Sequence, residues 1–209
     1  SLLAVQIASL VGPLPTSPPM PSTNLNYAAK IELGKQLYFD GRLSQNGAIS
    51  CAFCHNPGTG FADPRQTSIG IGGGVGGRQS PTVYNTAFNH LQFWDGRARS
   101  LEEQAIGPIH NPIEMGETHE NVVRKLGKVK GYQQQFRTVF GSEVNLQDLA
   151  NAIAAGVRRA ISASSMRTSS RPAKSKRVCP SMAASWAALS AISQATISLA
   201  TSRIGRSFS

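Results

Sequence analysis

The pattern of hydrophobic and polar residues predicts a protein built mainly of α-helices. A first amphipathic helix is expected between Tyr27 and Phe39, before a turn at Asp40 and Gly41. Its apolar residues recur at helical spacing, at Ile31, Leu33, Leu37 and Tyr38. No stretch alternates apolar and polar residues in a way that makes a persuasive sheet.

Two further helices are predicted from their starts. Ser100 with Glu103 three positions later has the form of a capping box and opens a helix through Ala105. Asn145 with Asp148 starts another. The apolar residues of this last helix lie on one face, at Leu146, Leu149, Ile153 and Val157.

Residues 44–60 are expected to form a loop and a short helix that carry the most informative motif. Cys51, Cys54 and His55 have the spacing C-x-x-C-H, which is the attachment signature of a c-type haem. Two thiols at this spacing can form thioethers with the two vinyl groups of one porphyrin, and the adjacent histidine is then the proximal ligand of the iron. The sequence therefore predicts one covalently bound haem c per chain.

Other chemistries use the same pair of cysteines. A thioredoxin-like dithiol requires a βαβ context, and a zinc site requires a second Cys/His pair at finger spacing; the sequence contains neither. The remaining alternative is structural, with two buried thiols beside a surface histidine. Cys179 is the one other cysteine, so no intrachain disulfide is expected once the haem is attached.

A glycine-rich loop follows the haem motif. Six of the eight residues from Gly70 to Gly77 are glycine. No Gly-Lys-Ser/Thr follows, so the segment does not indicate a phosphate-binding loop. We expect instead a loop whose backbone approaches a ligand closely.

Charge divides the chain into unlike parts. Residues 1–155 hold 12 Lys/Arg and 11 Asp/Glu, whereas residues 156–209 hold nine Lys/Arg and no acidic residue. We predict an extended Pro-rich arm (1–22), a cytochrome-c-like haem domain with long loops (23–157) and a basic Ser/Ala-rich tail (158–209). The basic residues of the tail form no stripe and have no aromatic residues between them in a regular pattern, so nucleic-acid binding is not expected.

Haem c is attached outside the bacterial cytoplasm, which favours a periplasmic protein. The first eleven residues are mostly apolar, lack a basic segment and are too short to span a bilayer. They are expected to be a mature N-terminus whose export signal has been removed.

Several motifs resemble the N-terminal domain of bacterial di-haem cytochrome c peroxidases and their MauG-like relatives. The resemblance runs from about residue 20 to about residue 155. It is carried, in the family's order, by residues 33–44 (LGKQLYFDGRLS), 49–57 (ISCAFCHNP), 80–85 (SPTVYN), 93–98 (FWDGRA), 104–109 (QAIGPI) and 114–115 (EM).

This resemblance implies a fold and an activity. Members have two cytochrome-c-like helical domains, each with one C-x-x-C-H, and peroxide reacts at the N-terminal haem. It implies reduction of hydrogen peroxide to water with electrons from a small redox protein, either a cytochrome c or a cupredoxin. Family members are often homodimers.

The resemblance also assigns residues to the site. It makes His55 the proximal ligand, puts Trp94 on the route between the haems, and lines the distal pocket with Gln104, Pro108 and Glu114. Peroxide cleavage requires a proton to move from one oxygen to the other, and a nearby carboxylate can carry it; Glu114 is the expected carrier. Taken alone, Glu114 would fit a solvated glutamate before a turn, and the indole of Trp94 would fit a core position.

Five further positions concern metal ions. Asn85 matches the position at which the family places a calcium ligand, although loop asparagines commonly just cap or turn. The remaining histidines, His90, His110 and His119, match no ligand position and are expected to be surface or loop residues. Ile71 stands where classical members have a histidine that ligates the resting iron. The resemblance therefore implies a distal face that is open from the start, as in the MauG-like branch, although another loop could still fill it.

A larger departure is that the chain has one C-x-x-C-H and no second haem motif. The acid-free tail has the composition expected of a gene read in a shifted frame, and the other interpretation is a genuine basic, partly helical tail. Two alternative functions follow. One is a mono-haem electron carrier in which Met115, 60 residues after His55, supplies the sixth iron ligand; the other is a non-functional frameshifted product.

Overall fold

The structure is a computed structural model that describes residues 14, 15 and 17–160 of the 209-residue chain. The first residues of the predicted arm, the predicted tail beyond residue 160 and Cys179 lie outside the described residues. Within the described part there are six α-helices: α2 (Ala28–Tyr38), α3 (Cys51–Cys54), α4 (Leu101–His110), α5 (His119–Gly127), α6 (Lys130–Phe140) and α7 (Leu146–Ala160).

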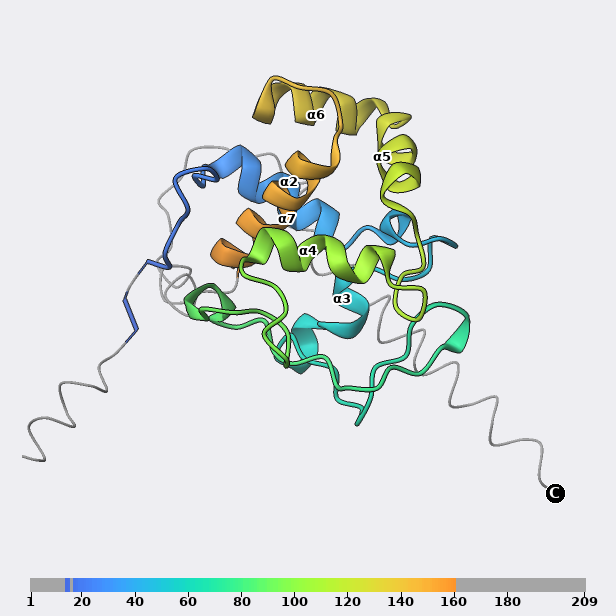
Figure 1. Cartoon of the computed structure of the whole chain (residues 1–209). Coiled ribbons are helices and arrows are strands. Elements are labelled where there is room, and N and C mark those ends of the chain that lie inside the picture. Colours follow the sequence, from blue (N-terminus) through green and yellow to red (C-terminus); the bar gives the residue numbers. More distant parts are fainter. Residues whose placement is uncertain (1–13, 16, 161–209) are drawn as a thin grey trace, which may run out of the picture. The chain divides into compact units, whose positions relative to one another are not determined.

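Long loops with short 3-10 turns join α3 to α4, and residues 55–100 lie together below these two helices in Figure 1. The described residues form no β-strand, and two isolated bridges, Ile69 with Val75 and Gln92 with Ala98, tie the loops locally. The predicted mainly α fold class is therefore confirmed.

Helices α2 and α7 cross at two glycines. A Cβ atom added to Gly34 would lie 1.9 Å from the carbonyl oxygen of Ala152, and one added to Gly156 would lie 2.8 Å from the carbonyl carbon of Gly34. Real Cβ atoms do not approach backbone atoms this closely. The absence of side chains at these positions is therefore what lets α2 lie directly against α7 (Figure 1).

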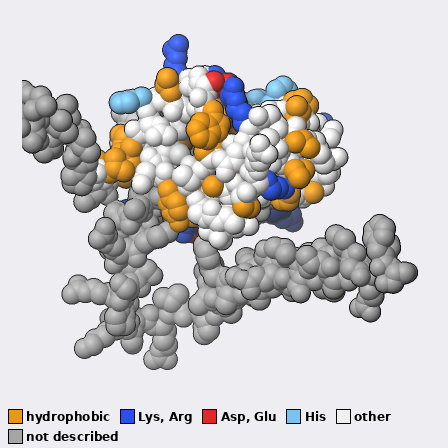
Figure 2. Space-filling view, turned by 90° about the horizontal axis from the view of Figure 1, so that it is seen from below, with side chains coloured by type: hydrophobic (Ala, Val, Ile, Leu, Met, Phe, Trp, Pro, Cys, Tyr) orange, Lys and Arg blue, Asp and Glu red, His pale blue; other side chains and the backbone are white. Residues whose placement is uncertain are grey.

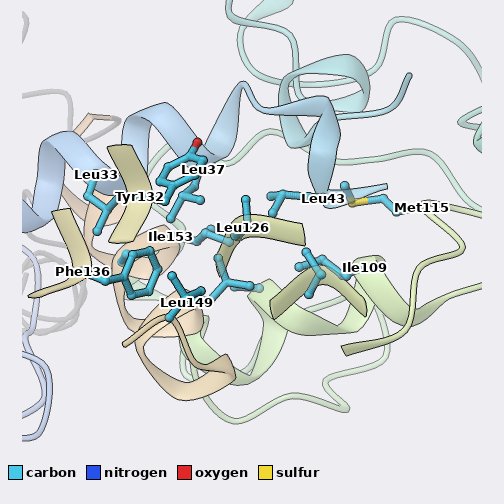
Figure 3. Close-up of a cluster of buried hydrophobic side chains, with 14 of the residues drawn as sticks. Leu33, Leu37, Leu43, Ile109, Met115, Leu126, Tyr132, Phe136, Leu149 and Ile153 are labelled. Carbon is cyan, nitrogen blue, oxygen red and sulfur yellow. The ribbon is translucent and has the colours of Figure 1, made fainter. Parts of the chain in front are cut away.

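The hydrophobic core lies between these two helices and the remaining ones. Figure 3 shows side chains from α2, α4, α5, α6 and α7 meeting in one cluster. Its buried members include Leu33, Leu37, Leu43, Ile109, Met115, Leu126, Tyr132, Phe136, Leu149 and Ile153. Burial of such side chains supplies the main favourable term for folding, on the order of 2 kcal/mol for each large apolar residue.

The two predicted helix starts are confirmed in the structure. The Ser100 hydroxyl accepts a hydrogen bond from the backbone N–H of Glu103 at 3.1 Å, although the Glu103 carboxylate reaches the N–H of Arg99 rather than that of Ser100. The Asn145 side chain accepts from the N–H of Asp148 at 2.9 Å. Each cap satisfies a backbone donor that has no partner within its own helix.

A buried polar cluster joins the segment before α2 to α4 and α7. The Arg158 guanidinium donates from Nη2 to Glu102 Oε2 at 2.8 Å, and its Nη1 forms an ion pair with Glu102 Oε1 at 2.7 Å. Asn24 donates to Glu102 at 2.6 Å and accepts from Lys30 at 2.9 Å. The first residues of the predicted tail, 158–160, therefore continue α7, and Arg158 contacts Glu102 of the predicted haem domain.

The described residues of the predicted arm, 14, 15 and 17–22, have no helix and are mostly exposed. None of the helices among the described residues is both long enough and apolar enough to span a membrane.

Candidate functional site

A cavity of about 360 Å³ lies between the haem motif, the loops and α4. Apolar side chains from three helices form much of its wall, among them Tyr38, Leu101 and Ile153. Cys51, Cys54 and His55 also line it. Figure 2 views the molecule from the side of the loops and shows separate groups of hydrophobic side chains with basic side chains between them. A mostly apolar cavity with a few polar groups is the usual form of a cofactor site.

The helix α3 presents both cysteines on the cavity wall. Neither forms a disulfide. Desolvation raises the pKa of Cys51 to about 12 and also raises the pKa of Cys54. Both sulfur atoms are therefore protonated thiols at neutral pH.

His55 ends this one-turn helix, and its ring is fixed by a backbone group. Its Nδ1 lies 2.9 Å from the carbonyl oxygen of Pro81, so Nδ1 carries the proton and donates it. Burial lowers the pKa of His55, which keeps the ring neutral. The Tyr38 hydroxyl donates to the His55 carbonyl at 2.7 Å and holds the backbone at the same place.

This donor set fits a c-type haem. Two free thiols share a cavity wall with a neutral histidine whose Nε2 is the nitrogen left to bind iron. The surrounding apolar side chains would cover the porphyrin faces. The fit rests on the orientation of His55 as well as on the motif.

Glu114, Gln104 and Pro108 line the same cavity. Gln104 and Pro108 are four residues apart on α4, and Glu114 follows the end of that helix. Asn111 donates to the Glu114 carboxylate at 2.7 Å. Burial raises the pKa of Glu114, partly offset by the Asn111 hydrogen bond and the charge of Arg97. The structure thus brings the predicted distal residues to the cavity that holds the haem motif.

Trp94 also lines the cavity, but it is not a core residue. Its side chain is 63% exposed, and its indole N–H donates to the Gln79 carbonyl at 2.9 Å. The interpretation of Trp94 as a core residue is therefore wrong. The preceding Phe93 has a positive backbone φ of +66°, which is uncommon for a residue with a side chain.

The glycine loop is fastened to the segment that carries Glu114. The Ile71 N–H donates to the Glu114 carbonyl at 2.8 Å, and a Cβ atom on Gly70 would lie 2.0 Å from the Ile113 oxygen. The close approach expected of this loop is therefore made to the backbone of residues 113 and 114. Ile71 packs against Gly116 and is not among the residues that line the cavity.

Asn85 lies outside the cavity wall. Its backbone is left-handed, with φ +59°, and its side chain does not cap the turn that follows. Among the described residues, no three or more His, Cys, Asp or Glu side chains gather as a metal site. The rings of His110 and His119 lie 5.1 Å apart, and His119 bonds the Ile106 carbonyl.

Sequence reasoning missed several residues of this site. Pro81 and Tyr38 hold His55, and Arg78 and Arg97 line the cavity. Arg97 and Pro81 belong to the motifs that carry the resemblance, but the sequence does not say that they face a common cavity.

Fold and cavity together define a haem-binding domain of the cytochrome c type, and comparison with known proteins identifies its family. The family model of di-haem cytochrome c peroxidases matches residues 28–171. The chain belongs to this family. The match extends beyond residue 157, where the haem domain was predicted to end.

Matches to individual relatives support the same family. The chain is 50% identical over 127 residues to cytochrome c551 peroxidase of Pseudomonas aeruginosa, a match that covers 59% of the chain and 37% of the relative. It is 46% identical over 129 residues to the methylamine utilization protein MauG of Methylorubrum extorquens, covering 62% and 36%.

A solved structure of a MauG-like protein associated with microbial copper homeostasis matches with a TM-score of 0.66 and 26% identity, covering 77% of this chain and 50% of that one. The chain thus spans well under half the length of these two curated relatives.

Proposed function

We propose that this chain is the peroxidatic haem domain of a periplasmic cytochrome c peroxidase, with one haem c attached to Cys51 and Cys54. The observation that carries the proposal is the shared cavity, whose wall contains the two thiols, the oriented His55 and the half-buried Glu114. A binding motif alone would fit any c-type cytochrome. A carboxyl group facing the same cavity adds acid–base chemistry.

In this proposal the bound haem supplies a redox-active iron at which the O–O bond of hydrogen peroxide is cleaved. His55 would hold that iron through Nε2, because Nδ1 is committed to the Pro81 carbonyl. The net reaction takes two electrons and two protons per peroxide and yields two waters.

Glu114 moves the proton that this reaction needs. Its carboxylate accepts a proton from one peroxide oxygen and returns it to the other, which then leaves as water. Burial raises the pKa of Glu114, so its carboxylate is a better base than that of an exposed glutamate. Asn111 keeps one carboxylate oxygen fixed at 2.7 Å, and the Gln104 amide can donate to the substrate.

The electrons come from a small cytochrome c or cupredoxin, and Trp94 at the exposed edge of the cavity is the proposed point at which they enter. In family members with two haem domains, the resemblance implies that the tryptophan at this position lies on the route between the haems. Homodimer formation and a calcium ion at Asn85 remain part of the proposal as expectations from the family.

The second candidate is a mono-haem electron carrier, which one observation favours. Met115 lines the cavity as well as belonging to the hydrophobic core. Its side chain is only 3% exposed and lies beside Leu43 and Ile109 (Figure 3), so ligation would require it to leave that packing. A non-functional product of a shifted reading frame is the third possibility.

Optical and electron-paramagnetic spectra of the ferric holoprotein separate these candidates. A high-spin signal is expected for an open peroxidatic pocket, and it should persist in Met115→Leu. A low-spin His/Met spectrum that becomes high-spin in Met115→Leu would instead establish the carrier. Failure to attach haem at all would support the non-functional product.

A further inference from the structure

We propose that Arg78 and Arg97, bridged by Asp95 at the edge of the cavity, form the binding site for the carboxylate groups of the bound porphyrin. This inference rests on the proposed function, because it requires that a haem occupies the cavity. It assigns a role to a charged cluster that peroxide chemistry at Glu114 does not use.

The cluster is built from two loops. Arg78 Nη1 lies 2.9 Å from Asp95 Oδ2, and Arg97 Nη1 lies 2.8 Å from Asp95 Oδ1. These interactions join the end of the glycine loop to the segment that carries Trp94. Two guanidinium groups share one carboxylate, so one net positive charge remains at the edge of the cavity.

The Arg97 side chain also contacts an aromatic ring. Its guanidinium carbon lies 3.5 Å from the centroid of the Phe93 ring, a cation–π arrangement. The Phe93 ring packs in turn against Gly107 of α4, where an added Cβ would lie 3.1 Å from its edge. The arginine therefore stacks on a ring that packs against the helix that carries Gln104.

The cavity wall has few other positively charged groups that could bind an anion. Arg78 and Arg97 are the only Lys or Arg side chains among the described residues that line it. A protoporphyrin carries two carboxylates on one edge and is apolar elsewhere. An apolar cavity can cover its faces, but its carboxylates require cations or water.

Both arginines have donors to spare. Each contributes one Nη1 atom to Asp95, and each guanidinium has five N–H donors in all. Side chains that are 57% and 50% exposed can meet a carboxylate at the entrance without leaving Asp95. Planar guanidinium groups are well suited to bind carboxylates through two parallel hydrogen bonds.

Three other ionisable groups bear on this site. Asp95 has a pKa of about 2, held low first by the Arg78 hydrogen bond and then by that of Arg97, so it stays ionised in the working range. Glu114 lines the cavity and senses the charge of Arg97. His55 is neutral and bonded to Pro81.

The test compares Arg78→Gln and Arg97→Gln with Arg137→Gln. Arg137 is an exposed arginine on α6 that pairs with Glu143 and does not line the cavity. In each holoprotein the midpoint potential of the haem is measured against pH, and a haemochrome assay on the same samples counts the attached haem. Every variant is also prepared with Glu114→Gln, so that ionisation of Glu114 does not enter the pH dependence.

Removing a cation beside the propionates raises their pKa. The pH range over which the potential falls should therefore move upward by about one pH unit in Arg78→Gln or Arg97→Gln. At pH values above this range, the midpoint potential should also be lower than in the wild type, because a smaller positive charge beside the haem favours ferric iron. Arg137→Gln should match the wild type.

Attached haem with profiles that are unchanged in both cavity variants would overturn the carboxylate site while leaving the proposed function intact. A wild-type chain without attached haem would instead contradict the proposed function itself.

Discussion

The Nδ1 atom of His55 lies 2.9 Å from the carbonyl oxygen of Pro81, although 26 residues separate them in the sequence. This hydrogen bond sets which ring nitrogen carries a proton and leaves Nε2 to bind a metal. It links the haem motif to the loop that the glycine-rich segment leads into. The orientation of the iron ligand therefore depends on the folding of the long loops.

The two thiols predict the stoichiometry of haem binding. Replacing Cys51 and Cys54 by Ala should abolish covalent attachment of the one haem expected per chain, because both thioethers are lost. A haemochrome assay on denatured protein measures this. A wild-type value of two haems per chain, or covalent haem in the double variant, would contradict the prediction.

The contact between α2 and α7 predicts a large loss of stability in Gly34→Ala. The new methyl group would lie 1.9 Å from a backbone oxygen, and backbone cannot move aside as a flexible side chain can. We expect destabilisation of at least about 3 kcal/mol, measured by urea unfolding.

Gly131→Ala in α6 is the matched control, because nothing lies within 4 Å of its added Cβ. It should stabilise the protein by about 0.5 kcal/mol through the better helix propensity of alanine. Equal effects of the two substitutions would mean that the close crossing does not form.

Asp63 predicts a loss of stability in acid. Arg65 donates to its buried carboxylate at 2.6 and 2.8 Å, and its pKa is about 2 rather than 3.8, chiefly because of this side-chain hydrogen bond. The folded state thus binds the proton less readily than the unfolded chain. The resulting stabilisation, about 2 kcal/mol, is complete above about pH 4 and is lost as the pH falls toward 2.

Urea unfolding between pH 6 and pH 2.5 measures this contribution. Asp63→Asn should be less stable than the wild type at pH 6, and the difference should shrink as the pH falls. A difference that stays constant over this range would show that the Asp63 carboxylate does not contribute in the way described.

The sequence predicted the parts of the fold that local chemistry determines. The first helix, the caps at Ser100 and Asn145 and the short helix at Cys51 each depend on residues a few positions apart, and each is confirmed. Helices α5 and α6 were missed. Their signals were present, since Val122 and Leu126, and Tyr132 and Phe136, are i,i+4 pairs of buried residues, with Gly141 in a left-handed conformation after α6.

The candidate site was harder to predict because its parts are distant in sequence. The haem motif and the resemblance named the residues that share the cavity, but nothing local indicates that Pro81 orients His55 or that Ile71 packs against Gly116. The exposure of Trp94 was also missed; the residue before it, Phe93, has a positive φ, which is unusual for a residue with a side chain.

Glu114→Gln tests the central claim most directly. Ferric holoprotein is mixed with hydrogen peroxide in a stopped-flow spectrometer, beside Glu120→Gln, which changes an exposed glutamate of α5. If Glu114 carries the proton, its substitution should keep the haem and the fold but slow the reaction about 10²- to 10⁴-fold, whereas Glu120→Gln should react like the wild type. Equal rates in all three proteins would contradict the account.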